Sequence, residues 1–154
     1  MIAKIIYGQT CRGTLNYVLG KEGIQVLGYG NTFSQDISPK FFESLLHFQG
    51  QRNATKNRYA HISLNLPHKE HVDDTTFFEI SQEYMEKMGY GEQPFIVVRH
   101  NDTKHEHVHI VTTNVNDKGQ VLSIYNSKRR SMATTSYLET KYNLEPAPRT
   151  KQEK

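Results

Sequence analysis

The histidine-rich segment between residues 99 and 111 is the part of this 154-residue chain best suited to chemistry. It holds four of the chain's eight histidines. His107 and His109 bracket a single valine in a run that is typical of a β-strand, whose alternate side chains project to the same face about 6.6 Å apart. Two imidazoles on one face can bind one metal ion through ligand bonds of about 2 Å.

A third histidine belongs to the strand expected just upstream. Residues 95–100 are β-branched and aromatic, and the polar interval 101–105 separates them from the next strand. Antiparallel pairing of the two strands would bring His100 beside His107 and His109. A set of three histidines leaves coordination positions open for water or substrate, as catalytic metal sites do.

Other residues bear on the kind of metal site. Cys11 is the only cysteine and is remote from the histidines in sequence, which disfavours a closed zinc site built on thiolates. Asp102 or Glu106 could orient an imidazole from behind. An open site of this kind can act as a Lewis acid on a phosphoryl oxygen or activate water. The alternative is that the histidines only decorate a polar hairpin, which fits any one of them better than the three together.

Composition indicates a single globular domain, with 36% hydrophobic and 23% charged residues. No apolar run is long enough to cross a bilayer or to act as a signal peptide, so we expect a cytoplasmic protein without membrane insertion. The net charge of +3 is too small to establish a nucleic-acid partner by itself. Arg99 and the basic run Lys128, Arg129 and Arg130 could neutralise phosphates, although such runs are often only solvated surface.

The expected fold class is α+β: a two-layer domain with a central, mainly antiparallel five-stranded sheet and helices packed on one side of it. Strands are expected at residues 2–6, 58–66, 95–100, 107–115 and 121–125, with a further short strand compatible with residues 25–27. Helices are expected from Thr10 as N-cap to Gly20, from Ser38 and Pro39, from Asp73 or Asp74, and over 131–143. Residues 1–144 form the domain, and residues 145–154 have the composition of a linker to a further C-terminal region.

Tyr17 lies in the first expected helix, where Leu15, Val18 and Leu19 form an apolar stripe. Two positions from Leu15 correspond to about 200° around a helix, so Tyr17 should stand off the core face with its hydroxyl available. An ordinary tyrosine at the edge of the core is the alternative.

The strand at residues 58–66 has the clearest alternation in the chain. Its apolar residues face one way, and His61 and Ser63 face the other. If this second face lies beside the histidine hairpin, His61 and Ser63 could contact a substrate; otherwise they are half-exposed strand residues.

These residues resemble those of a known family. The sequence His100-x-Asp102-x-x-His105-x-His107-Val108-His109-Ile110-Val111, followed by Asn116 and Gly119, closely resembles the third motif of conjugative relaxases, the HUH endonucleases of the plasmid mobilisation type. The resemblance extends over nearly the whole chain and includes the opening strand, the nucleophile helix, the second motif and the segment before the metal hairpin, at residues 1–5, 15–19, 61–64 and 84–90.

The resemblance implies a metal-dependent relaxase that nicks and rejoins single-stranded DNA at an origin of transfer. It matches His107 and His109 to the metal pair and His100 to the third ligand. It matches Tyr17 to the nucleophile, which forms a 5′-phosphotyrosyl link and leaves a free 3′ hydroxyl. Asp102 and His105 match motif positions that would orient groups or handle protons.

The family commonly works with Mg²⁺ or Mn²⁺, whereas three imidazoles would suit Zn²⁺ or Ni²⁺ at least as well. Implied partners are the DNA, accessory relaxosome proteins and a coupling protein, and we expect a monomer. Because the total positive charge is low, DNA binding would depend on base stacking and hairpin recognition, or on sequence beyond residue 154.

Three other functions compete with this interpretation. A rolling-circle replication initiator or a transposase of the same superfamily would use a downstream tyrosine, for which Tyr137 and Tyr142 are candidates. Tyr137 and Lys141, however, are one residue off the spacing of such initiators. A non-catalytic metal-binding or DNA-binding module would bind without cleavage, and a metallohydrolase would release a free 5′ phosphate.

Overall fold

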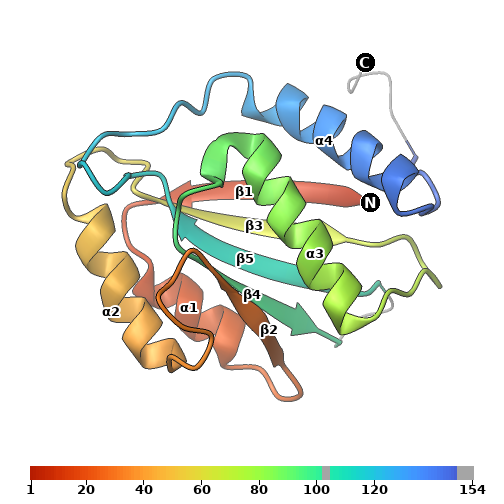
Figure 1. The fold of residues 1–154 in the computed structure, drawn as a ribbon, viewed down its shortest axis with the longest axis horizontal. Coiled ribbons are helices and arrows are strands. Elements are labelled where there is room, and N and C mark those ends of the chain that lie inside the picture. Colours follow the sequence, from red (N-terminus) through yellow and green to blue (C-terminus); the bar gives the residue numbers. More distant parts are fainter. Residues whose placement is uncertain (102–104, 149–154) are drawn as a thin grey trace.

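The computed structural model describes residues 1–101 and 105–148. Its five strands form one sheet in the order β1-β3-β5-β4-β2, in which every neighbouring pair is antiparallel (Figure 1). The strands are β1 Ile2–Gly8, β2 Gln25–Gly30, β3 Tyr59–Asn65, β4 Phe95–His100 and β5 His107–Thr113. The predicted α+β class and five-stranded antiparallel sheet are confirmed.

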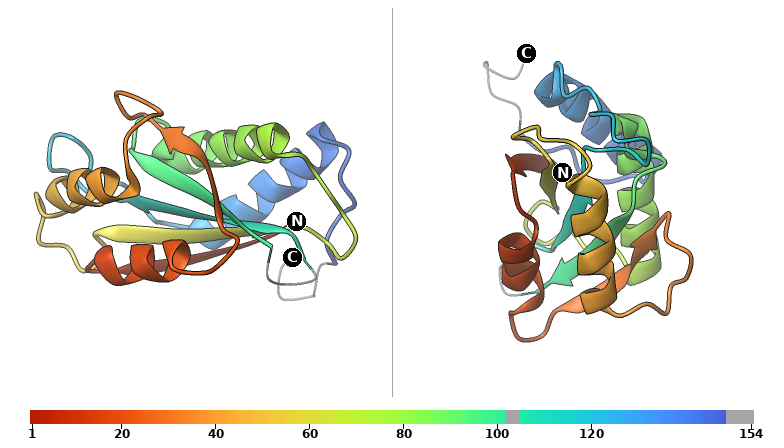
Figure 2. Two further views of the ribbon diagram at one scale, coloured as in Figure 1. Left: turned by 90° about the horizontal axis from the view of Figure 1, so that it is seen from below. Right: turned by 90° about the vertical axis from the view of Figure 1, so that its left-hand side faces the viewer.

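Four α-helices cover this sheet: α1 Arg12–Leu19, α2 Pro39–Gly50, α3 Asp74–Met85 and α4 Ser127–Lys141, with a π-helical turn, η1 Glu86–Tyr90, after α3. Side chains of α3 and α4 pack on one face of the sheet with Ile62 and Ile110. Side chains of α1 and α2 pack on the other face with Ile96 and Val111. Figure 2 shows α3 and α1 on opposite sides of the strands. The expectation of helices on one side only is therefore wrong in this detail, because β4 and β5 are apolar on both faces and need cover on both.

Side-chain caps begin two of the helices, as the sequence predicts. The hydroxyl of Ser38 accepts a hydrogen bond from the Phe41 amide (3.1 Å), and the carboxylate of Asp73 accepts one from the Thr76 amide (2.7 Å). Thr10 does not cap α1; the N-cap is Cys11, whose side chain makes no capping bond. Within η1 the backbone departs from helical geometry at Gly89, whose φ of 93° favours glycine.

One predicted strand and the start of one helix near the C-terminal end differ from the prediction. Residues 121–125 form no strand in the described chain and contribute only the single bridge between Val115 and Val121. The fifth strand is instead Gln25–Gly30, which pairs with β4 across a register shift between Val26 and Gly28. Helix α4 begins at Ser127, four residues before the predicted start at 131.

Among the described residues, no helix has the length and apolar character needed to cross a bilayer.

Candidate metal centre and nucleophile

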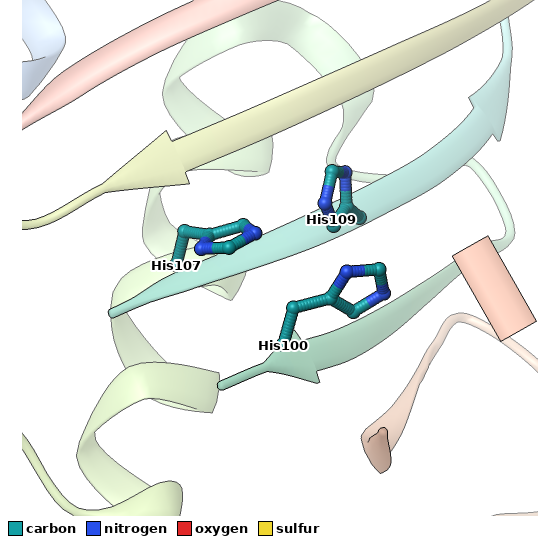
Figure 3. A group of neighbouring side chains, drawn as sticks. All are labelled: His100, His107 and His109. Atoms are coloured by element: carbon teal, nitrogen blue, oxygen red, sulfur yellow. The ribbon is translucent and has the colours of Figure 1, made fainter. Parts of the chain in front are cut away.

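The register of β4 and β5 brings three histidines onto one face of the sheet. His100 pairs with His107, and Val98 pairs with His109, in the antiparallel ladder that the sequence predicts. Directly paired residues project to the same face, so all three imidazoles gather on one side of the hairpin (Figure 3). This is the face that carries α1 and α2.

The three imidazoles are close enough to serve one ion. One ring nitrogen from each of His100, His107 and His109 lies within 4.8 Å of the others, and all three residues are buried. Their ring centroids are 4.2 Å apart for His100 and His109, 5.0 Å for His107 and His109, and 5.5 Å for His100 and His107. Nitrogens this close together can bind one ion, to which imidazole bonds are about 2.1 Å long.

Hydrogen bonds to backbone carbonyls orient two of these rings. Nε2 of His100 donates to the Val18 carbonyl oxygen of α1 (2.7 Å), so the lone pair of the neutral ring is on Nδ1. Nδ1 of His107 donates to the His105 carbonyl oxygen (3.0 Å), which leaves the lone pair on Nε2. Each ring is therefore held in the tautomer that a metal ligand requires, and the residues fit a divalent ion.

His61 orients the third imidazole. Nε2 of His61 lies 2.7 Å from Nδ1 of His109, so the two rings share one hydrogen bond. Burial, together with the nearby His100, lowers the pKa of His61 below its usual value. A neutral His61 can accept a hydrogen bond from Nδ1–H of His109, which leaves the lone pair of His109 on Nε2, where it can bind an ion.

Tyr17 stands beside this cluster at the surface of α1. Its ring centroid is 6.1 Å from that of His109 and 6.5 Å from that of His61, with edge-on packing in both cases. The side chain is 52% exposed, whereas Leu15 and Val18 of the same helix are buried. The predicted position of Tyr17 off the apolar stripe is confirmed. Lys21 places its ammonium 5.2 Å from the centre of the Tyr17 ring.

Open hollows connect the tyrosine with the histidines. A groove of about 810 Å³ is lined by Tyr17, His107 and His109 together with chain segments on either side. A neighbouring hollow of about 510 Å³ is lined by Tyr17, His61 and Ser63 among others. His61 and Ser63 therefore open toward the same solvent-filled space as Tyr17.

Of the two remaining motif residues, the structure describes His105 alone, and this residue lies outside the three-histidine cluster. His105 is exposed on the rim of the groove, where Nδ1 lies 3.2 Å from the Leu66 carbonyl oxygen and the ring is 5.7 Å from that of His68. Asp102 lies outside the described residues.

Arg99 points away from the three histidines, although the sequence suggested that it contacts DNA. It points to the other face of β4, and its side chain is only 4% exposed. It donates to Asp74 (2.9 Å), to the Val72 carbonyl oxygen (2.9 Å) and to Glu106. Glu106 also contacts His71 and thus faces away from the imidazoles that it was expected to orient.

The basic run lies in the first turn of α4, which packs on the face opposite the histidines. Lys128 and Arg129 are exposed there. Arg130 is bonded to backbone carbonyl oxygens of Met88, Ser123 and Tyr125, which gives it a role in fixing the loop before α4.

The alternative nucleophiles lie on the α3 and α4 side of the sheet. Tyr137 packs against Lys87 of η1, whose ammonium is 3.9 Å from its ring centre. Tyr142 lines a separate hollow with Glu83, and burial raises its pKa. Neither shares a described contact or hollow with the histidine cluster, which counts against a downstream nucleophile.

Sequence reasoning overlooked two cations beside the site. Lys4 of β1 pairs with Ser63 of β3 and lines both hollows, and Lys21 follows α1 and lines the larger one. The available signal was the alternation of β1, in which Lys4 interrupts an apolar run and so occupies an outward position.

Comparisons with known proteins agree with this fold. Residues 17–144 match the model of the family described as "Relaxase: MobA/VirD2-like, nuclease domain". The chain therefore belongs to the MobA/VirD2-like relaxase family, as its nuclease domain, and it is a nuclease whose role is DNA nicking in mobilisation.

One similar solved structure comes from a study called "Molecular Basis of Vancomycin Resistance Transfer in Staphylococcus aureus". Its TM-score is 0.53 at 11% sequence identity, and the match covers 94% of this chain and 95% of that chain. At this identity the similarity shows a shared fold. No curated protein sequence matches the chain.

Proposed function

We propose that this domain nicks single-stranded DNA at an origin of transfer by transesterification through Tyr17, and rejoins the strand by the reverse reaction. The observation that carries the proposal is the 6.1 Å separation between the ring of half-exposed Tyr17 and the ring of His109. A phenol on a groove that two of three convergent imidazoles line suits phosphoryl transfer, because this arrangement brings a nucleophile and an electrophilic site to the same substrate atom.

In the forward reaction the phenol oxygen of Tyr17 attacks the scissile phosphorus, and the bond from phosphorus to the 3′ oxygen breaks. The phenol proton ends on the departing 3′ oxygen, and the 5′ phosphate stays on the tyrosine. One phosphodiester is exchanged for another, so the step is reversible and the free 3′ hydroxyl can reseal the strand. His100, His107 and His109 would hold a divalent ion, which would supply Lewis-acid stabilisation of charge on the phosphate.

The surrounding residues assist this step by position and charge. His61 keeps His109 in the ligating tautomer through the 2.7 Å contact between their rings. Lys21, whose ammonium is 5.2 Å from the Tyr17 ring centre, favours negative charge that develops on the phenol. The family implies Mg²⁺ or Mn²⁺, and the imidazole donors also suit Zn²⁺ or Ni²⁺, so the metal is best determined by adding each ion to chelated protein.

The test is incubation of the protein with labelled single-stranded origin DNA and Mn²⁺, followed by denaturing electrophoresis. Wild-type protein should give a covalent protein–DNA band, and Tyr17→Phe should give none, since phenylalanine keeps the ring but removes the oxygen. Tyr137→Phe is the matched control and should retain the band, whereas EDTA should remove it.

Other results would contradict the proposal. Release of DNA with a free 5′ phosphate and no covalent band would identify a hydrolase. DNA binding with no cleavage under any metal would identify a non-catalytic module. A band that survives Tyr17→Phe and disappears with Tyr137→Phe would identify a downstream nucleophile.

A further inference from the structure

The segment Glu145–Pro148 lines the same groove as the proposed nucleophile. Its sequence is typical of a linker, yet all four of its residues line the hollow that also contains Tyr17, His107 and His109. The chain therefore returns from the end of α4 to the histidine side, and it does so beside the site where DNA would be cut.

Hydrogen bonds hold this segment in place. The Leu144 amide donates to the Glu139 carbonyl oxygen (2.8 Å), and the Ala147 amide donates to the carboxylate of the same glutamate (2.8 Å). The Glu145 amide donates to the carboxylate of Glu70 (3.1 Å). Ala147 is only 5% exposed. Anchored at two of its own backbone amides and at the Leu144 amide just before it, and stiffened by two prolines, the segment forms a fixed surface.

The groove has the chemistry of a single-strand binding site. Pro146 and Pro148 present apolar rings without backbone donors, and Leu66 and Pro67 also line the groove. Lys4 and Lys21 supply positive charge beside Tyr17. Apolar walls that receive bases, together with cations that receive phosphates, are the features by which proteins bind single strands.

We propose that Glu145–Pro148 is a rigid wall of the DNA groove, against which a nucleobase next to the scissile phosphate packs. The proposal rests on the proposed function for its ligand, single-stranded DNA. It makes Pro146 and Pro148 positioning residues that determine how the strand lies on Tyr17. Glu145, the one carboxylate among the described residues that line the groove, would keep phosphates away from the wall and direct them to the lysines.

The first test measures binding of fluorescein-labelled oligo-dT by fluorescence anisotropy in EDTA, so that no cleavage intervenes. Combined Pro146→Ala and Pro148→Ala should raise the Kd about fivefold or more, because a base loses its packing surface. Pro39→Ala, at the start of α2 and outside the groove, is the matched control and should leave the Kd unchanged. Circular dichroism and the melting temperature verify that each variant is folded. An unchanged Kd in the folded double variant would overturn the proposal that Glu145–Pro148 is a wall of the DNA groove.

The second test does not depend on a variant that folds. Photo-cross-linking with oligonucleotides that carry 5-iododeoxyuridine, followed by trypsin digestion, should attach DNA to the peptide spanning residues 142–149. Cross-links confined to the first turn of α4, with none on this peptide, would overturn the proposal.

The wall and the proposed function can fail separately. If wild-type protein forms the covalent band but oligo-dT binding ignores the two prolines, the wall is wrong and the nickase proposal stands. If binding depends on the prolines but no covalent band forms, the wall stands as a DNA-binding surface and the nickase proposal is wrong. Absence of any single-strand binding would contradict both.

Discussion

The two faces of the β4–β5 hairpin hold different kinds of residues. On one face His100, His107 and His109 lie close enough together to hold one ion, and His107 and His109 line a groove. On the other face Val97 and Ile110 are fully buried under α3 and α4. Alternation along two strands thus places the histidines, beside apolar residues packed under α1 and α2, on one face and an entirely different core cluster on the other.

Arg99 marks the boundary between the two faces. It immediately precedes His100 in the chain, yet it points into the opposite layer and ties the hairpin to Asp74 of α3 and to Glu106. One residue of register therefore distinguishes a candidate metal ligand, His100, from a structural ion pair. Substitutions on the two faces should affect different measurements.

The largest expected effect is on catalysis, from His109→Ala. Loss of one of three ligands should lower the rate of covalent-adduct formation about a thousandfold or more, since Lewis-acid stabilisation depends on the complete set. The free energy of unfolding should change by less than about 1 kcal/mol, because the residue contributes little to the core. Adduct kinetics and urea denaturation measure both, with His47→Ala on the exposed side of α2 as the control. A large loss of stability would mean that His109 itself contributes substantially to the packing under α1 and α2.

Ile110→Ala probes the opposite face. Truncation of a fully buried isoleucine should cost about 2–5 kcal/mol of unfolding free energy through lost transfer energy and a cavity. The adduct rate per folded molecule should stay within about threefold of wild type. Ile6→Ala, at a largely exposed position of β1, should cost less than about 0.5 kcal/mol. Loss of activity in folded Ile110→Ala protein would show that the two faces are coupled.

Arg99→Met tests the boundary residue. Removal of the guanidinium leaves Asp74 and Glu106 with only their contacts to Gln25 and His71, and we expect about 1–3 kcal/mol of destabilisation, reduced by the partial exposure of both carboxylates. Oligo-dT affinity should be unchanged at a temperature where the variant is folded. A stable variant with weakened DNA binding would instead support Arg99 as a DNA contact.

His61→Phe should have the smallest effect. It removes the acceptor that orients His109, and affinity for Mn²⁺, measured by isothermal titration calorimetry, should fall about tenfold. His61→Gln, which keeps an acceptor, should recover part of the affinity, and Ser63→Ala should retain it. Equal affinity in wild type and His61→Phe would show that the imidazole of His109 needs no second partner.

Local patterns were sufficient to predict most strands and the histidine cluster. Three local patterns predict directly which residues are buried: the alternation at residues 58–66, the apolar run at 95–100 and the valines after His107. The direction of Tyr17 followed from helical spacing around Leu15. These features depend on neighbours within a few residues.

Features that depend on distant partners were missed. Arg99 looked like a surface cation because its partner Asp74 lies 25 residues away in sequence and in another layer. The bond between His61 and His109 requires the register of β3 on β5, which no local pattern gives. The segment after Leu144 has linker composition, and the carboxylates of two distant residues, Glu139 and Glu70, hold it in place through its backbone amides.

The 2.7 Å bond from His100 to the Val18 carbonyl joins positions 82 residues apart in the sequence. A ribosome that has produced the tyrosine helix has therefore not yet produced any of the ligands with which that tyrosine would work. Strand β5, inserted between β3 and β4, must also emerge before the imidazoles converge. A partly synthesised chain would be inert toward DNA, so competence to cut would arise only near completion of the domain.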